Sequence, residues 1–149
     1  MSPGAGLASS SGLTLGFIVS PGTGFVVCFG LTLALLGVVV VTGLKARRAL
    51  HLTCVVLTVA ALGATIYYAY GLGKIYDLAA AGWITPVHLS LARANTVALL
   101  VPVVTGIRTM FVPATRALHR RMAFLVIGLT VLTAITGAWM LWLAPKFPA

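Results

Sequence analysis

Acidic side chains are almost absent from this sequence, whose 149 residues include a single aspartate, Asp77, and no glutamate. General acid–base catalysis commonly uses paired carboxylates, and proton-pumping membrane proteins use carboxylates within the membrane. One acidic residue supplies neither arrangement. The sequence also lacks a nucleophile with an orienting base, a glycine-rich phosphate loop and an H-E-x-x-H motif. We therefore predict no catalytic residues and no enzymatic activity for this chain.

Cysteine is scarce too. Cys28 and Cys54 each stand alone in an apolar run, and the sequence has no C-x-x-C pair. Because disulfides and soft-metal sites need paired or clustered cysteines, we interpret both thiols as buried apolar side chains and predict no metal site.

Charged residues make up only 7% of the chain, hydrophobic residues make up 60%, and the mean hydropathy is +1.12. A soluble domain of this length needs more charge on its surface. Four stretches reach the roughly 20 apolar residues that cross a bilayer as a helix: about 21–43, 50–71, 86–107 and 121–143. They do not alternate like barrel strands. We predict an all-α, four-transmembrane-helix up-and-down bundle over 21–149, after a Gly/Ser-rich segment at 1–20.

Basic residues gather in two of the connections between these stretches. They are Lys45, Arg47 and Arg48 in the first connection, and Arg108, Arg116, Arg120 and Arg121 in or beside the third. The positive-inside rule places loops 44–49 and 108–120 in the cytoplasm and both termini outside. We expect the net charge of +9 to meet anionic lipids and not nucleic acid, because the basic residues are few and dispersed.

Proline marks the expected helix boundaries. Ser20-Pro21 and Thr85-Pro86 each resemble an N-cap residue followed by proline in the first helical position. Pro102 falls inside the third apolar stretch. Since proline lacks an N–H and its ring crowds the preceding turn, we expect it to kink that helix.

The tetrapeptide RALH occurs twice, at 48–51 and 116–119, each time heading a long apolar run. It places His51 and His119 at matched depth on two helices that are diagonal in an up-and-down bundle. Facing histidines in a bundle can bind one b-type haem, which makes both residues candidate haem or metal ligands. The other interpretation is a basic collar that touches lipid phosphates. The repeat is also compatible with duplication of a hairpin, although the halves match poorly elsewhere.

The third apolar stretch carries His88 near its start, with Asn95 and Pro102 following at steps of seven. This spacing places the three residues on one face of a helix. The face either lines a ligand pocket or contacts a neighbouring helix, where asparagine commonly forms hydrogen bonds.

Arg93 lies about 10 Å into the same helix, from the usual rise per residue. A charge at this depth is costly unless it is paired or reaches the surface. Its guanidinium either snorkels to the outer headgroups, pairs with Asp77, or binds a partner's carboxylate, a haem propionate or a quinone-type ligand. One acid against ten Lys and Arg cannot neutralise the chain, so Arg93, His88 and Asn95 are candidate partner or ligand contacts.

Residues 45–143 resemble the small four-helix membrane proteins of the CtaM/YozB type. The resemblance rests on both RALH histidines, on "ATIYYAYG", on the proline-led "WITPVHLSLARANTVALLVPVVTGIR" and on "LHRRMAFLVIGLTVLTAITGAWML", which contains Thr136-Gly137. That family usually carries four histidines. Here one of those positions falls at or near Tyr70-Gly71, another is Asn95, and His88 has no obvious family counterpart.

The studied member of that family acts in the biogenesis of haem-copper terminal oxidases. The resemblance therefore implies a non-catalytic integral-membrane accessory or assembly subunit of a larger respiratory or photosynthetic electron-transfer complex, in the inner (cytoplasmic) membrane of a bacterium. The alternative function is a small b-type cytochrome with one haem between His51 and His119. A third hypothesis is a transporter-like or quinone-binding module around Arg93, His88 and Asn95.

Overall fold

The computed structural model describes residues 20–147, and the regular elements in this range are all helices. Four segments of the described chain are long and apolar enough to cross a membrane. They are Pro21–Leu44, Arg48–Leu72, Ile84–Phe111 and Pro113–Leu143. The expected all-α class with four transmembrane-length helices is confirmed for this range. The Gly/Ser-rich segment predicted at 1–20 lies, except for Ser20, outside the described residues.

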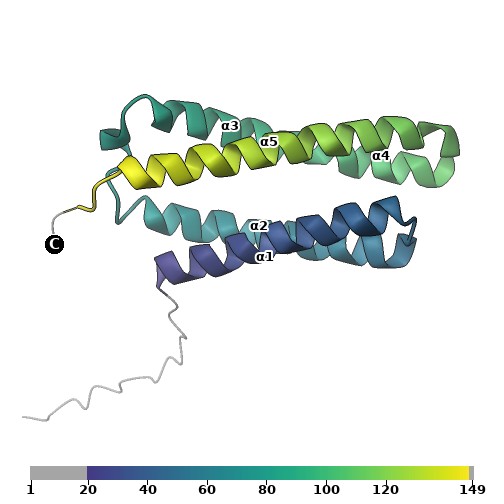
Figure 1. The fold of residues 1–149 in the computed structure, drawn as a ribbon, viewed down its shortest axis with the longest axis horizontal. Coiled ribbons are helices and arrows are strands. Elements are labelled where there is room, and N and C mark those ends of the chain that lie inside the picture. Colours follow the sequence, from purple (N-terminus) through teal and green to yellow (C-terminus); the bar gives the residue numbers. More distant parts are fainter. Residues whose placement is uncertain (1–19, 148–149) are drawn as a thin grey trace, which may run out of the picture. The chain divides into compact units, whose positions relative to one another are not determined.

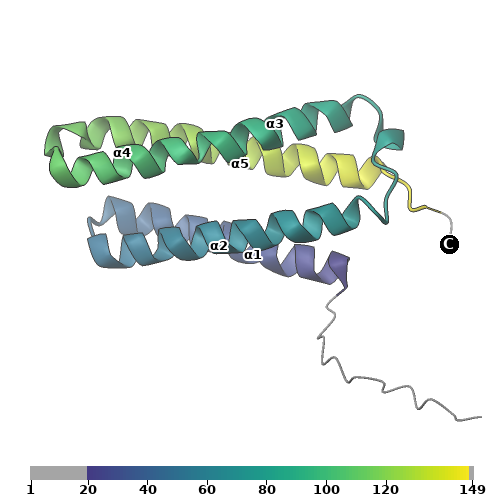
Figure 2. The ribbon, with the colours of Figure 1, turned by 180° about the vertical axis from the view of Figure 1, so that it is seen from behind.

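The chain divides into two compact units between Tyr68 and Ala69. The first unit, here the first hairpin, contains α1 (Pro21–Leu44) and all but the last turn of α2 (Arg48–Leu72), and the two helices lie side by side in Figures 1 and 2. Ser20 caps α1 as predicted, because its hydroxyl oxygen accepts the N–H of Thr23 at 3.2 Å.

The second unit, here the second hairpin, contains α3 (Ile84–Ala98), α4 (Leu100–Phe111) and α5 (Arg116–Leu143), with the short 3-10 turns η1 (Ala79–Ala81) and η2 (Pro113–Thr115). In both views α3 and α4 follow one another along α5 (Figures 1 and 2). The helix is interrupted at Leu99, because Pro102 cannot donate to the carbonyl four residues before it. The distortion predicted at Pro102 is confirmed as this break.

The predicted cap at Thr85 is wrong. The third transmembrane segment begins at Ile84, two residues before the predicted first helical position Pro86, and the Thr85 hydroxyl donates to the carbonyl oxygen of Leu78 in the preceding loop. Gly82, with φ of 74°, turns the chain so that this loop folds back. Ile84 is 1% exposed and packs with Met140 of α5. Burial of this anchor sets the helix start, and the local Thr-Pro signal does not.

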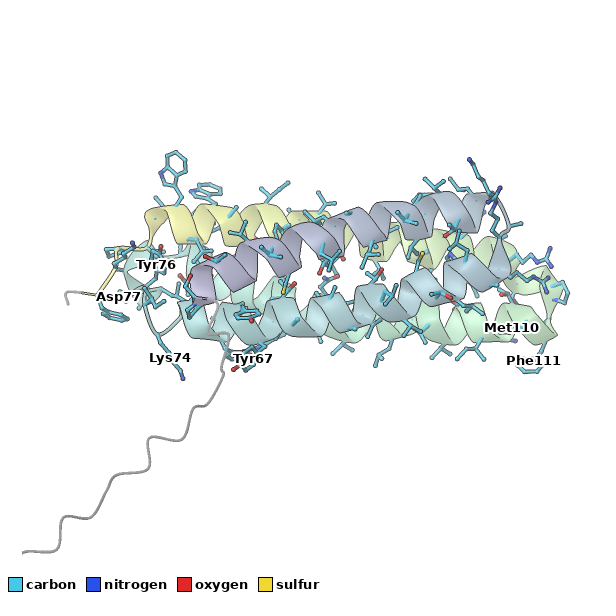
Figure 3. The ribbon with its side chains drawn as sticks, turned by 90° about the horizontal axis from the view of Figure 1, so that it is seen from below. Tyr67, Lys74, Tyr76, Asp77, Met110 and Phe111 are labelled. Carbon is cyan, nitrogen blue, oxygen red and sulfur yellow. The ribbon has the colours of Figure 1, made fainter. Side chains whose placement is uncertain are left out.

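The loop between α2 and α3 is tied to the C-terminal tail of the second hairpin. The Asp77 N–H donates to the Pro145 carbonyl at 2.8 Å, and the Phe147 N–H donates to the Ile75 carbonyl at 3.0 Å. The Asp77 carboxylate accepts the N–H groups that open η1, from Ala79 and Ala80, at 3.1 and 3.2 Å. Figure 3 shows Asp77 at this end of the second hairpin, far from Phe111 at the other. The only acid in the sequence therefore serves as a local cap.

The distribution of polar side chains is the reverse of that in a soluble protein. Five polar residues are buried within the described chain: Thr32, Thr42, Thr65, Asn95 and Thr136. Large apolar side chains cover the outer surfaces of both hairpins and are widely exposed. Helices in lipid gain little from burying apolar surface against one another, so hydrogen bonds and close packing hold them together. The arrangement fits a membrane-embedded chain.

Candidate functional site

Each of the three histidines rests on a Thr-Gly dipeptide of the neighbouring helix in its own hairpin. We call such a dipeptide a threonine–glycine seat. The pairs are His51 with Thr42-Gly43, His119 with Thr105-Gly106 and His88 with Thr136-Gly137. In each pair the ring nitrogen Nδ1 faces the threonine hydroxyl, and the ring carbon Cε1 lies over the glycine.

His51 joins α2 to α1 at the turn of the first hairpin. Its Nδ1 lies 3.0 Å from the Val39 carbonyl oxygen and 3.4 Å from the Thr42 hydroxyl. A carbonyl only accepts, so Nδ1 carries the hydrogen and Nε2 is the acceptor nitrogen of the neutral ring. The glycine provides the space: a Cβ added to Gly43 would lie 3.1 Å from Cε1 of His51. His51 is therefore partly buried against α1.

His119 makes the corresponding contact between α5 and α4. Its Nδ1 lies 3.2 Å from the Thr105 hydroxyl, which itself donates to the Val101 carbonyl at 2.8 Å. The hydroxyl hydrogen is used within α4, so the oxygen accepts from the imidazole. A Cβ on Gly106 would lie 3.2 Å from Cε1 of His119. The two RALH copies therefore place histidine in the same local setting, each inside its own hairpin.

His88 joins the start of α3 to the end of α5. Its Nδ1 lies 3.3 Å from the Thr136 hydroxyl, and that hydroxyl lies 3.0 Å from each of two carbonyls of its own helix. This is the tightest histidine seat, because a Cβ on Gly137 would lie only 2.7 Å from Cε1 of His88. Any side chain at residue 137 must displace the ring.

A fourth seat, Thr23-Gly24, lies under the ring of Tyr68, and a Cβ on Gly24 would overlap that ring. All four Thr-Gly dipeptides of the sequence therefore hold an aromatic ring. Tyr68 follows His51 by 17 residues, and Thr136 follows His119 by the same interval. Aligning the RALH copies thus pairs a ring in one hairpin with a seat in the other.

A further polar contact lies midway along each hairpin. The hydroxyls of Thr32 and Thr65 lie 3.1 Å apart in the first hairpin. In the second, the Thr130 hydroxyl donates to the Asn95 side-chain oxygen at 3.1 Å. Asn95 therefore forms an interhelical hydrogen bond, the role that asparagine commonly has between membrane helices.

The structure brings His88 and Asn95 to one face of α3, where both contact α5, and it separates Arg93 from them. Arg93 is exposed, and within residues 20–147 it makes no hydrogen bond or ion pair. His51 and His119 belong to different units. In the described part of the chain no three His, Cys, Asp or Glu side chains are grouped to hold a metal ion.

Sequence reasoning missed the seats as partners of the histidines. The signal was present in the sequence as four Thr-Gly dipeptides, all of which lie inside the predicted transmembrane stretches. Pairing a dipeptide with its ring needs the fold, since His88 and Thr136 are 48 residues apart.

No protein-family model, curated protein or solved structure matches this chain. The resemblance to the CtaM/YozB type stays a prediction from the quoted motifs.

Proposed function

We propose that this chain is a non-catalytic accessory or assembly subunit that lies in the membrane beside a larger electron-transfer complex. One observation carries the proposal: the histidines, the asparagine and the buried threonines are used to join helices within each hairpin. Side chains engaged in this way hold a scaffold together and are not presented to a substrate.

The outer surface supports an interaction role. Exposed leucine, valine, phenylalanine and tryptophan side chains cover both hairpins, so lipid or another membrane protein must surround them. The association with respiratory or photosynthetic electron transfer comes from the resemblance of the RALH and Thr136-Gly137 motifs to the CtaM/YozB type. The contribution proposed for the chain is packing against the complex, with Arg93 among the contacts.

Native electrophoresis of membranes from cells that make the protein tests the proposal. With a C-terminal tag and digitonin extraction, we expect the 15.4 kDa chain to migrate in an assembly several times its own mass and to co-elute with the haem absorbance of an electron-transfer complex. Migration as a single free chain in digitonin and in milder extraction by polymer nanodiscs would contradict the proposal.

A small b-type cytochrome is the second candidate function, and the geometry of His51 favours it. Histidines that bind metals commonly donate one ring N–H to a carbonyl and ligate through the other nitrogen. His51 makes such a bond to Val39. Reduced-minus-oxidised absorption spectra of the chain purified alone separate the two functions. The accessory role predicts no haem band, whereas a cytochrome predicts a b-type band that His51→Ala and His119→Ala both remove.

We further propose that the chain lies in a bacterial cytoplasmic membrane with loops 44–49 and 108–120 on the cytoplasmic side. The basic residues of these loops support this orientation. In a chain whose two cysteines are replaced by alanine, Ala80→Cys and Ala114→Cys form a matched pair. In intact spheroplasts we expect an impermeant maleimide to label residue 80 and not residue 114. Labelling in the opposite pattern would reverse the orientation.

A further inference from the structure

Arg93 lies on the side of α3 that faces away from the second hairpin's own interior. Each residue of an α-helix advances by about 100°, so Arg93 and Asn95, two positions apart, point to nearly opposite sides. Asn95 is buried against Thr130 of α5. Arg93 is exposed, in agreement with this geometry.

Arg93 is also the basic residue placed deepest in a transmembrane segment. It stands nine residues after Ile84 in the 28-residue segment Ile84–Phe111, roughly 14 Å along a helix of roughly 42 Å. A hydrocarbon core of about 30 Å centred on this helix would include it. The other nine Lys and Arg lie in the connections, in the tail or within about two turns of a helix end. A membrane centred on this segment would therefore hold the backbone of Arg93 at the depth of the hydrocarbon core.

Apolar side chains extend along this face from Arg93 toward the end of α4. Apolar residues at successive steps of three or four after Arg93 continue this face across the break at Leu99, and all are exposed: Val97 at 67%, Leu100 at 62%, Val104 at 64%, Ile107 at 54% and Phe111 at 80%. We call this set, together with Arg93, the α3–α4 outer face. Arg93 is the one charge in the part of this face that runs from Arg93 to Val104, and a second exposed charge, Arg108, follows near the end of α4.

The chain cannot supply the counter-charge. Its only acid, Asp77, sits in the end loop and accepts two backbone N–H groups there. A guanidinium in hydrocarbon is stabilised by a carboxylate, which it can bind through two parallel hydrogen bonds. The apolar residues that flank Arg93 fit the side chains of another membrane-spanning helix. Charge complementarity therefore selects the occupant of this face.

We propose that the α3–α4 outer face docks a transmembrane helix of a partner protein, and that this helix carries an Asp or Glu at the depth of Arg93. The inference rests on the proposed accessory role and specifies the partner that this role requires. Lipid phosphate reached by snorkelling is the competing occupant. The two occupants differ in what lies beside Val97, which is one turn deeper than Arg93.

Two variants with matched charge change test the pairing in native membranes. Arg93→Met keeps a long apolar stem and removes the charge; Lys74→Met removes an exposed charge from the end loop. We expect the co-migrating fraction of Arg93→Met to fall by at least about tenfold, as for loss of one partner of a buried pair, with normal amounts of chain in the membrane. Lys74→Met should co-migrate like the natural chain.

A photo-crosslinking amino acid placed at Val97 identifies the occupant, with Leu125 on the exposed surface of α5 as the control position. We expect a discrete protein adduct from Val97, lost in the Arg93→Met background, with a carboxylate within one turn of the crosslinked residue. Lipid adducts alone at Val97, or undiminished co-migration of Arg93→Met, would overturn the inference and leave the accessory role standing. Failure of the natural chain to join any complex would overturn both.

Discussion

Substitution of Gly137 by alanine probes the tightest of the three histidine seats. The added Cβ would lie 2.7 Å from Cε1 of His88, which is 0.7 Å closer than the 3.4 Å at which ordinary van der Waals contact begins. Moving the ring by that amount lengthens its 3.3 Å contact with Thr136 beyond hydrogen-bond range. Overpacking costs about 1–3 kcal/mol, and an interhelical hydrogen bond in a membrane contributes about 0.6 kcal/mol. We expect the free energy of unfolding to fall by about 2 kcal/mol.

The assay is reversible unfolding of the full chain in mixed micelles of dodecyl maltoside and SDS, followed by circular dichroism. Gly128→Ala is the matched control, because it lies in the same helix and a Cβ there would have no neighbour within 4 Å. Alanine's higher helix propensity should leave that variant unchanged or more stable by up to about 1 kcal/mol.

A double-mutant cycle makes the test specific to the seat. In a His88→Ala background the clash is absent, so Gly137→Ala should lower the free energy of unfolding only slightly. The interaction energy between the two substitutions should therefore be nearly as large as the loss that Gly137→Ala causes when His88 is present. The reasoning is refuted by equal costs of Gly137→Ala in the two backgrounds, or by equal stability of Gly137→Ala and Gly128→Ala.

Three further outcomes are expected in the same unfolding assay. Gly43→Ala, whose added Cβ would lie 3.1 Å from His51, should lower the free energy of unfolding by less than Gly137→Ala does. A larger loss would show that the distance from the added Cβ to the ring does not determine the loss of stability. Thr130→Val should lower the free energy of unfolding by about 0.6 kcal/mol, because it removes the donor to Asn95, whereas Thr96→Val, whose hydroxyl bonds only within α3, should have a smaller effect. Ala46→Gly should raise the free energy of unfolding by about 1 kcal/mol, because Ala46 has φ of 54° in the turn between α1 and α2 and this left-handed conformation is costly for alanine. A loss of stability in this variant would contradict that conformation.

Local signals in the sequence predict the helices well. Long apolar runs mark the four segments, Ser20 marks the start of α1, and Pro102 marks the break in the third segment. Each of these features depends on residues close together in the chain. Thr85 carries an equally clear local signal and fails, because burial of Ile84 and the bond to Leu78 are contacts made across a loop.

The histidine seats show what a sequence cannot supply without the fold. RALH identifies His51 and His119 as equivalent positions, and the spacing of seven places His88 and Asn95 on one face. The partners of these residues lie on other helices, up to 48 residues away. Periodicity gives the face of a helix but not the helix that it meets. The role of a histidine as ligand, collar or seat therefore depends on tertiary contacts.

The measurement that tests the account most directly is ¹⁵N NMR of the histidine side chains in the full chain, reconstituted in lipid nanodiscs. The tautomer of each neutral ring can be read from its two nitrogen shifts. A seated ring holds its hydrogen on Nδ1, bonded to the neighbouring helix, as the Val39 carbonyl requires for His51. We expect His51, His88 and His119 all to show this form, unchanged by added haem. A His51 ring protonated at Nε2 and exchanging with water, or shifted by bound haem, would contradict the account.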